Sequence, residues 1–366
     1  MVNGCLPLIH RTLPARCDDV VARDAQGTFD YVWETFDEYY AFFDQRNVDW
    51  AAEYARQLPK VGEATDDVAL FGLLSDLLSP IDDGHVFIES NNDGYSSAVE
   101  RGINLEFERG FAAQSEVTDI NVWANGVFGE FRDVIESLLD EGSTDDQSQL
   151  AWGTADDGTT GYINIFGMEG YVLDEDGEPM GASLSNELAA ANATMDTVMA
   201  NLADTTRLII DLRFNGGGFD AISFNFAQRF ISERQLAFSK SARSRDFQSV
   251  PSEAWLEPPA TGAYLNPVTL IVGADTSSAA EIFAIPMSQL PQVTVIGVRT
   301  AGILSDVLVK PLPNGWVMGL SNEVYLDAQG VSYEGIGLTP DMEVPVFLVD
   351  DIKAGVDQAL ELALSL

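Results

Sequence analysis

The sequence predicts an α/β protein with a layered core of strands and helices in its second half and a helical domain in front of it. Two patterns predict this fold class. From Gly161 onward, short β-rich apolar runs alternate with helical segments, as in sheets that are buried on both faces. Between residues 29 and 78, apolar side chains recur at steps of three and four, which indicates amphipathic helices. Hydrophobic residues make up 46% of the 366 residues, which excludes a mainly disordered acidic chain.

The front of the chain is predicted to form three helices. The first covers residues 29–43, where a stripe of aromatic side chains follows the helical period. Two more helices are expected over residues 50–58 and 66–78. We interpret the aromatic stripe as a packed core face rather than as a ligand-binding box, and we assign residues 26–84 to an N-terminal helical domain.

The rest of the chain divides into a connecting region and the core domain. Residues 85–152 show a mixed signal of short strands and one helix near residues 127–139. Residues 153–366 form the core domain, which ends in an amphipathic helix over residues 351–366. The core is predicted to contain strands over residues 162–166, 208–212, 268–272 and 293–298, and helices over residues 183–202, 221–231 and 278–290.

The charge of the chain excludes several classes of partner. The chain carries 58 acidic and 19 basic side chains, a formal net charge of −39. A surface this negative repels the phosphates of nucleic acids and anionic lipid headgroups, so we expect no nucleic-acid partner. No apolar run approaches the roughly 18 residues that a membrane-spanning helix needs, so we expect no membrane span.

Cysteine and histidine usage argues against a metal or cofactor site. The chain has two cysteines, Cys5 and Cys17, and two histidines, which is too few at these spacings for a zinc site or a redox pair. The cysteines either form a local disulfide, which would suit an oxidising compartment, or remain free thiols. Residues 1–25 are interpreted as a leader segment that lacks the apolar stretch of a signal peptide. Either the protein stays inside the cell or the chain begins after a removed signal; the cysteine pair favours the second, and with it a periplasmic or secreted location.

A glycine-rich turn follows the strand predicted at residues 208–212. Residues 213–218 read Arg-Phe-Asn-Gly-Gly-Gly and lead into a predicted helix. Backbone without side chains lets a substrate approach closely, and free N–H groups near a helix start attract a negative oxygen. The alternative is a tight strand-to-helix turn, although three consecutive glycines exceed what such a turn needs.

A second strand-to-helix junction carries hydroxyl groups. Thr276, Ser277 and Ser278 follow the strand predicted at residues 268–272 and precede Glu281. A serine here would hold its hydroxyl beside unpaired helix N–H groups, which combines a nucleophile with an oxyanion site. The alternative is that one of the three hydroxyls only caps the helix. Glu281 is expected to serve the start of that helix, where a carboxylate complements the dipole.

Two further residues, a histidine and a glutamate, are candidates for a catalytic role. His85 ends the segment Asp-Asp-Gly-His that follows the helical domain, and it is better placed than His10, which lies in the leader. Taken alone, a single histidine is more often structural than catalytic. Glu334 lies in a glycine-punctuated loop that by itself would be interpreted as a surface turn.

These four features, in this order, resemble the serine peptidase family that contains the carboxy-terminal-processing proteases and the tricorn core proteases. Ile-Asp-Leu-Arg at residues 210–213, followed by asparagine and glycines, is similar to the strand and turn of that family. Ser-Ala-Ala-Glu at residues 278–281 is similar to its nucleophile segment. Asp-Gly-His at residues 83–85 and Glu-Gly-Ile-Gly at residues 334–337 resemble the tricorn-type branch. The resemblance covers roughly residues 29–345.

The resemblance implies a serine-dependent peptide hydrolase, an endopeptidase or a carboxy-terminal processing enzyme, that needs no cofactor or metal. Ser278 would be the nucleophile, His85 its base, and Glu334 the carboxylate that supports the base. The implied oxyanion hole consists of the backbone N–H groups of Ala279 and of Gly217 or Gly218.

The chain departs from the family pattern in three respects. The branch with a Ser–Lys dyad has a lysine where this chain has Ile303, and the nearest downstream lysine is Lys310, so we expect no such dyad. Tricorn core enzymes have a serine before the histidine, where this chain has Gly84. Glu334 would then reach His85 directly, through water or through another hydroxyl. We also expect the family's PDZ domain to be absent or replaced.

The resemblance further implies a fold and a substrate. The core would have the ββα layered fold shared with the ClpP and crotonase families, and the substrate would be a peptide or protein. Lys240, Arg243 and Arg245 form a basic cluster. The two arginines are candidates for binding a substrate carboxylate; the alternative is that they are counter-ions for acidic neighbours. Two alternative functions stay open: a non-catalytic binding protein on the same scaffold, and an esterase or lactone hydrolase. Association into a homo-oligomer also stays open.

Overall fold

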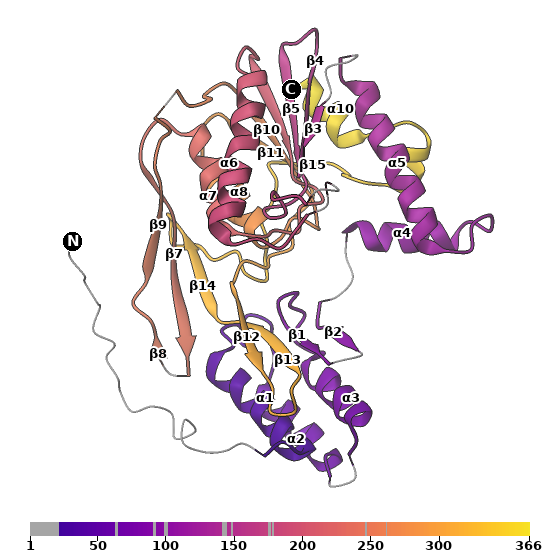
Figure 1. Cartoon of the computed structure of the whole chain (residues 1–366), viewed down its shortest axis with the longest axis vertical. Coiled ribbons are helices and arrows are strands. Elements are labelled where there is room, and N and C mark those ends of the chain that lie inside the picture. The colour runs from indigo at the N-terminus through magenta and orange to yellow at the C-terminus, as the bar shows by residue number, and fades with distance from the viewer. Residues whose placement is uncertain are drawn as a thin grey trace.

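The chain folds into a core of sheet and helices and a smaller lobe of helices and strands, which lies below the core in Figure 1. Cys5, Cys17 and most of the predicted leader lie outside the described residues, so the disulfide stays a prediction. The computed structural model describes residues 22–62, 65–90, 93–98, 102–140, 145–147, 149–174, 177, 179–245, 247–260 and 262–366.

Three helices form the lower lobe, within a few residues of the predicted ranges. They are α1 (Ala25–Tyr39), α2 (Trp50–Gln57) and α3 (Asp67–Leu78), and a short 3-10 helix, η2 (Leu58–Lys60), continues α2. An aspartate precedes each α-helix and accepts a hydrogen bond from a backbone N–H of its first turn. These caps satisfy donors that have no partner inside the helix.

The helices of the lobe pack on a four-stranded antiparallel sheet with the order β12–β13–β1–β2. The aromatic stripe of α1, which includes Phe29 and Phe36, shares one buried cluster with Met318 and Leu320 of that sheet. Two of the strands come from far downstream in the sequence, so distant residues complete the core of the helical lobe. The strands are β1 (Phe87–Glu89), β2 (Gly94–Ser96), β12 (Val307–Pro311) and β13 (Val317–Ser321).

The core is built on a seven-stranded sheet with the order β15–β11–β10–β6–β5–β4–β3. Neighbours from β15 to β5 run parallel, whereas β4 and β3 are antiparallel additions at one edge. β5, β6, β10 and β11 are the four strands predicted from their continuous apolar runs. The strands are β3 (Asp145–Gln147), β4 (Leu150–Ala155), β5 (Thr160–Ile165), β6 (Arg207–Asp211), β10 (Val268–Val272), β11 (Val293–Gly297) and β15 (Met342–Glu343).

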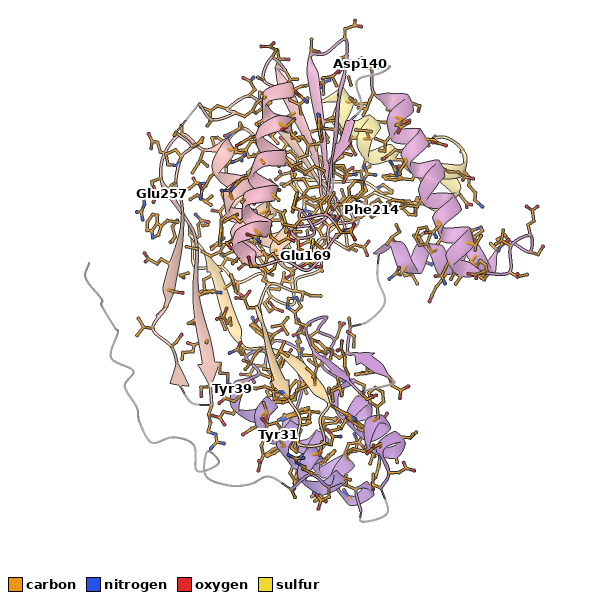
Figure 2. The ribbon with its side chains drawn as sticks, viewed as in Figure 1. Tyr31, Tyr39, Asp140, Glu169, Phe214 and Glu257 are labelled. Carbon is orange, nitrogen blue, oxygen red and sulfur yellow. The ribbon has the colours of Figure 1, made fainter. Side chains whose placement is uncertain are left out.

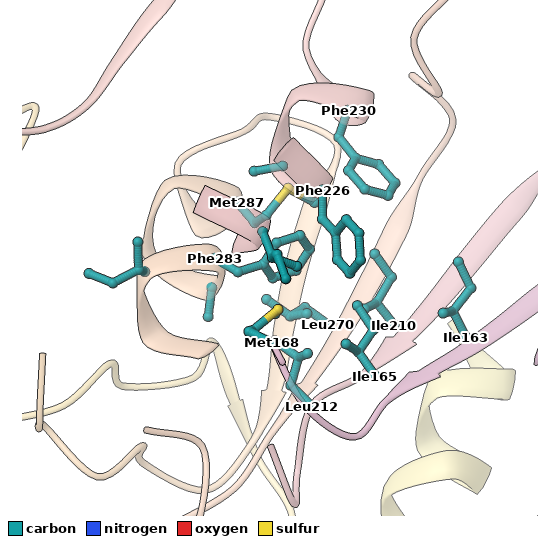
Figure 3. Packing of buried hydrophobic residues seen from close by; sticks show 14 of the residues in the cluster. Ile163, Ile165, Met168, Ile210, Leu212, Phe226, Phe230, Leu270, Phe283 and Met287 are labelled. Carbon is teal, nitrogen blue, oxygen red and sulfur yellow. The ribbon is translucent and has the colours of Figure 1, made fainter. Parts of the chain in front are cut away.

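Helices cover both faces of this sheet, and side chains fill the space between the layers (Figure 2). Figure 3 shows one of the two buried clusters, in which Phe226 and Phe283 pack on Ile210 and Leu270 of the central strands. The layer on that face consists of α6 (Leu184–Asn201), α7 (Asp220–Ala227) and α8 (Ala279–Ser288). The opposite layer consists of α4 (Gly102–Ala112), α5 (Ile120–Leu138), α9 (Val349–Lys353) and α10 (Gln358–Ser365).

Several elements differ from the sequence prediction. The single C-terminal helix that we predicted is divided in two, because Gly355, with φ 78°, ends α9 in the left-handed conformation and Asp357 then caps α10. The connecting region contains α4 besides the predicted α5, and η3 (Gln228–Phe230) continues α7. A third sheet was not predicted. It consists of β7 (Gln235–Ser244), β8 (Phe247–Gln248), β9 (Ser252–Leu256) and β14 (Glu323–Asp327).

A buried ion network joins the end of β6 to the C-terminal segment. Arg213 is fully buried and forms ion pairs with Asp211 and with Asp357, each at 2.7 Å. It also donates to the carbonyl of Val346 at 2.6 Å. The aspartate and the arginine of the Ile-Asp-Leu-Arg run are therefore structural, because they hold the C-terminal segment against the sheet.

Arg213→Met should destabilise the protein by about 3–5 kcal/mol, since it leaves two buried carboxylates without their cation. Urea unfolding followed by circular dichroism measures this change. Arg234→Met removes an exposed arginine that pairs with Glu257 and should cost less than about 1 kcal/mol. Equal stabilities of the two variants would contradict the structural role of Arg213.

The described residues contain neither a membrane-spanning helix nor a cluster of metal-binding side chains. No helix among them combines the length and the apolar character needed to cross a membrane. Nor do three or more of their His, Cys, Asp or Glu side chains gather as a metal-binding group.

Candidate active site

Ser278 lies at a sharp junction between strand β10 and helix α8. Its backbone has φ 53° and ψ −127°, a left-handed conformation that non-glycine residues rarely adopt and that clusters at functional sites. Ser278 precedes the first residue of α8, yet its side chain makes no capping bond. A serine on such a strained strand-to-helix turn presents its hydroxyl outward, as nucleophiles of many hydrolases do.

The neighbouring hydroxyls have structural partners. Thr276 donates to the carbonyl of Leu212 and accepts from the N–H of Gly273. Ser277 donates to the carbonyl of Gly216. Thr276 therefore ties this junction to the residue that follows β6, Ser277 ties it to the glycine turn, and neither caps α8. Within the described part of the chain, the hydroxyl of Ser278 has no hydrogen-bond partner, so it is the one available for reaction.

The glycine turn lies directly against Ser278. A Cβ atom placed on Gly217, whose φ is 107°, would lie 2.6 Å from the Cβ of Ser278 and 2.9 Å from the backbone nitrogen of Ala279. The N–H of Gly217 donates to the side-chain oxygen of Asn215. The N–H groups of Ala279 and Gly218 have no acceptor among the described residues. Of the two glycines considered, Gly218 is therefore the one whose N–H remains available to an oxyanion.

His85 lies two residues before β1, and its ring is mostly buried. Its backbone N–H donates to the side chain of Asp83. The ring atom Nδ1 is buried and has no hydrogen-bond partner in the described structure. Burial lowers the pKa of His85 below its usual value of 6.5, although the carboxylate of Asp83 and the backbone of Ser305 oppose this. The ring is therefore neutral near pH 7 and able to accept a proton.

Ser278 and His85 meet the same short segment, residues 303–305. The N–H of Ser278 donates to the carbonyl of Ile303 at 2.7 Å, and the backbone of Ser305 interacts with the ring of His85. The side chain of Ile303 also reaches Gly84, where an added Cβ would lie 2.8 Å from its Cδ1. Residues 303 and 305 are two positions apart, so at most about 7 Å of extended chain separates them. The fold therefore brings Ser278 and His85 into one region.

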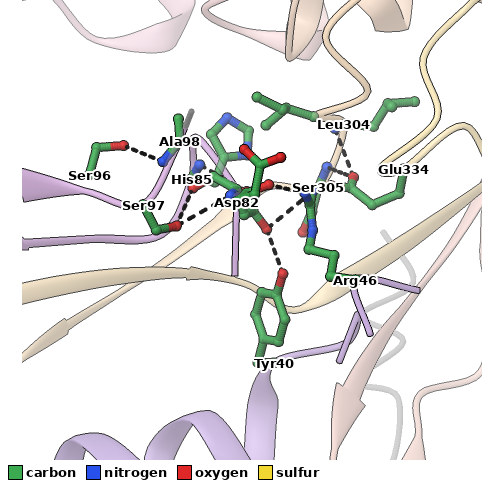
Figure 4. Close-up of polar contacts among 12 residues, drawn as sticks. Tyr40, Arg46, Asp82, His85, Ser96, Ser97, Ala98, Leu304, Ser305 and Glu334 are labelled. Atoms are coloured by element: carbon green, nitrogen blue, oxygen red, sulfur yellow. Dashed lines mark hydrogen bonds and ion pairs between the residues drawn. The ribbon is translucent and has the colours of Figure 1, made fainter. Parts of the chain in front are cut away.

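Glu334 supports this segment from the other side (Figure 4). Its carboxylate accepts from the backbone N–H groups of Leu304 and Ser305 at 2.8 and 3.0 Å and from Arg46 at 2.9 Å. Arg46 also lies 3.6 Å from Asp83. None of the described hydrogen bonds of Glu334 goes to His85; the connection runs through the backbone of residues 304–305 and through the Arg46–Asp83 pair.

The residues that sequence reasoning missed belong to this network. Arg46 bridges Asp83 and Glu334, and Tyr40 donates its hydroxyl to Asp83 at 3.0 Å. Asp83 is fully buried and stands two positions before His85. The rarity of basic residues in this acidic chain was the one available signal for Arg46, because its partner Glu334 is 288 positions away in the sequence.

Glu281 has a role beyond the one we expected. It lies in the first turn of α8, but its buried carboxylate accepts from the hydroxyl of Thr300 and from the N–H groups of Gly302 and Ile303. It therefore fixes the start of the segment that contacts Ser278. Its place in the first turn agrees with the prediction that it serves the start of the helix, and its bonds to residues 300–303 add a connection between α8 and that loop.

The basic cluster is occupied by structural contacts. Lys240 forms ion pairs with Asp306 and Glu323. The guanidinium of Arg243 donates to the backbone carbonyls of Tyr40 and Asp37 at the end of α1. Arg245 is exposed, and its backbone N–H bonds to the carbonyl of Glu38. These contacts favour the interpretation of Arg243 as a cap of α1 over a role in binding a substrate carboxylate.

Three buried carboxyl groups make the stability of the protein depend on pH. Burial raises the pKa of Glu281 to about 7, of Glu334 to about 8 and of Asp220 to about 6. The folded state then binds these protons more tightly than the unfolded state, so the contribution of these three groups to stability is fully present below their ordinary pKa values of about 4 and is lost as the pH rises through 6–8. The melting temperature should be several degrees higher at pH 5.5 than at pH 8.5.

Two matched variants test this assignment. Glu281→Gln should reduce the difference between the melting temperatures, whereas Glu233→Gln, which removes one exposed carboxylate, should leave it unchanged. A melting temperature that rises from pH 5.5 to pH 8.5 would contradict the prediction.

Lys310→Ala should retain most of any hydrolytic activity. Lys310 lies on β12 with its ammonium 5.0 Å from the ring centre of Tyr39, in the lower lobe. Ile303 occupies the position expected for the lysine of a Ser–Lys dyad. A peptide hydrolysis assay checks the variant, and an inactive but folded Lys310→Ala protein would restore the lysine mechanism.

Comparison with known proteins places this chain in a family. Residues 159–344 match Peptidase family S41, and residues 22–79 match the Tricorn protease C1 domain. The first match spans just over half of the 366 residues. The chain belongs to peptidase family S41. This match confirms the family resemblance that the sequence motifs indicated.

Individual S41 relatives agree with this assignment. The carboxy-terminal-processing protease of Bartonella bacilliformis is 25% identical over 154 residues, which is 42% of this chain. The match covers 34% of that relative, so the chain spans about a third of its length.

Solved structures show the same fold. The structure of a protein from Parabacteroides merdae has a TM-score of 0.70 at 24% identity and covers 93% of this chain and 96% of that one. The photosystem II D1 C-terminal processing protease has a TM-score of 0.50 at 14% identity, with 89% and 95% covered. The predicted α/β fold class is confirmed; the likeness to the ClpP and crotonase families and the domain limits stay predictions.

Proposed function

We propose that this S41 protein is a serine-type peptide hydrolase whose nucleophile is Ser278 and whose general base is His85. The observation that carries the proposal is the geometry of Ser278. Its strained backbone, its unbonded hydroxyl and the adjacent N–H groups of Ala279 and Gly218 form the parts of an acyl-transfer site. A protein that only binds a ligand has no need for this combination.

The reaction would proceed in two steps. The ring of His85 takes the proton of Ser278 while the hydroxyl oxygen attacks the peptide carbonyl carbon, and the N–H groups of Ala279 and Gly218 stabilise the resulting oxyanion. The carbon–nitrogen bond then breaks, and His85 returns the proton to the leaving amine. Water, deprotonated by the same ring, hydrolyses the acyl-enzyme and releases the acid.

Glu334 would act as a positioning residue in this reaction. It fixes the backbone of residues 304–305, which contacts the ring of His85, and it shares Arg46 with Asp83. The carboxylate of Asp83, whose charge favours the protonated ring, would stabilise the imidazolium that forms when His85 accepts the proton. This arrangement replaces the serine that tricorn core enzymes have at the position of Gly84.

We further propose a carboxy-terminal processing role and a location outside the cytoplasm. The names of similar proteins, carboxy-terminal-processing protease and chloroplastic C-terminal processing peptidase, support this role. The substrate would be the end of a peptide or protein. Association into a homo-oligomer belongs to the same proposal, and size-exclusion chromatography with light scattering tests it.

Labelling with a fluorophosphonate probe tests the proposed nucleophile. The probe forms a covalent bond only with an activated serine, and mass spectrometry identifies the residue. We expect labelling of Ser278 together with hydrolysis of peptide amides. An unlabelled protein would favour the binding-protein alternative, and labelling with hydrolysis of esters alone would favour the esterase.

A further inference from the structure

A cavity of about 490 Å³ opens beside the proposed oxyanion hole. Gly218 lines it, and so does Asp306, whose charge acts on His85. The cavity therefore begins where the side chain next to a scissile bond would project. Its volume is in the range of sites that bind small groups. The cavity is also lined by Phe219, Phe224, Phe238, Asp220, Lys240 and Tyr325.

The walls of the cavity are apolar, and its charges are mostly negative. Phe219 directly precedes α7, Phe224 lies in the middle of that helix, and Phe238 lies on β7. Among the described residues that line the cavity, Asp220, Asp306 and Glu253 are acidic and Lys240 is the one cation. Such a site suits a side chain with an apolar stem and a charged end.

The single cation already has two carboxylate partners. Lys240 pairs with Asp306 at 2.6 Å and with Glu323 at 2.7 Å. Asp220 accepts a hydrogen bond from the hydroxyl of Tyr325 at 2.8 Å, but it forms no ion pair with any described residue. Asp220 is thus a largely buried carboxylate without a cation of its own.

The electrostatic state of Asp220 supports the same conclusion. Burial and, after it, the carboxylate of Asp306 raise the pKa of Asp220 to about 6, while Tyr325 and Lys240 oppose the shift. A negative charge here is costly because nearby Asp306 and Glu323 repel it. A cation brought into the cavity would relieve this repulsion and form a partly desolvated pair.

We propose that this cavity is a specificity pocket for a lysine or arginine side chain, with Asp220 as its anionic partner. The proposal rests on the proposed peptidase function, since the pocket would select the residue that is cleaved. An uncharged substrate side chain would fill the apolar part but leave Asp220 without a cation. Basic residues should therefore be preferred over apolar residues of similar size.

Binding of small cations tests the pocket without catalysis. Benzamidine and its uncharged analogue benzamide are titrated into the full chain and its Ser278→Ala variant, and isothermal titration calorimetry measures their affinities. Benzamidine should bind at least about tenfold more tightly than benzamide to both proteins. Asp220→Asn should lower the affinity for benzamidine about tenfold, and Asp204→Asn, an exposed matched control, should not. Equal binding of the two probes would overturn the proposal.

Hydrolysis of paired substrates provides the second measurement. Two peptide amides differ only in lysine or norleucine before the scissile bond. The kcat/KM ratio should favour lysine at least about tenfold, and Asp220→Asn should remove most of that preference while the norleucine substrate is still cleaved. A preference for norleucine would overturn the pocket, whatever the rate.

The two proposals fail in different ways. If benzamidine binds but Ser278 is neither labelled by a fluorophosphonate nor able to cleave peptides, the peptidase function fails and the cation site remains. If Ser278 reacts and benzamidine does not bind, the pocket fails alone. If Asp220→Asn does not fold, Asp306→Asn, at a half-exposed position, should weaken benzamidine binding in the same direction, and an unchanged affinity would count against the pocket.

Discussion

Ser278→Ala should reduce turnover of a peptide substrate by on the order of a million-fold and leave the fold unchanged. No neighbouring hydroxyl can take over, because Thr276 is bonded to Leu212 and Ser277 to the glycine turn. The lost oxygen makes no described hydrogen bond, so its removal should not alter the melting temperature by more than a few degrees. Peptide hydrolysis and thermal melting measure the two effects.

Ser277→Ala is the matched control for this prediction. It removes the adjacent hydroxyl, which donates to Gly216 at 3.1 Å, and should keep most of the activity. If Ser277→Ala were inactive and Ser278→Ala active, the nucleophile would be assigned one residue too late.

His85→Ala should reduce turnover to a similar extent, since an alcohol cannot attack an amide near neutral pH without a base to take its proton. The activity of the parent enzyme should rise with pH, with a midpoint below 6.5, because burial lowers the pKa of His85. The matched control is His10→Ala, which removes the other histidine of the chain and should keep full activity.

Two results would contradict this role of His85. One is a folded His85→Ala protein with activity near that of the parent. The other is a pH profile with its midpoint well above 6.5, which would indicate a lysine or another base of higher pKa.

The parts of the fold that the sequence predicted are those with local signals. The strands β5, β6, β10 and β11 are buried on both faces, so their apolar runs are nearly continuous and easily recognised. Ser278 and Gly218 were proposed as site residues because each follows such a strand and precedes a helix. His85 was proposed largely by elimination, since the chain has only two histidines.

The parts that the sequence did not predict depend on distant pairings. β1 and β2 have three residues each, which is too short for a recognisable pattern. They form strands because β1 pairs with β2 and with the distant strand β13. The contact of Arg46 with Glu334 joins the lower lobe to a loop of the core. No local pattern marks either residue as part of an ion pair, so only the folded chain shows how Glu334 connects to the site.

A crystal structure of the protein after reaction with a fluorophosphonate tests the site most directly. We expect phosphorus on the oxygen of Ser278, a phosphonyl oxygen about 2.7–3.1 Å from the N–H nitrogens of Ala279 and Gly218, and a ring nitrogen of His85 about 2.6–3.2 Å from the Ser278 oxygen. A phosphonyl oxygen that contacts neither N–H group, or a His85 ring beyond reach of Ser278, would contradict the proposed mechanism.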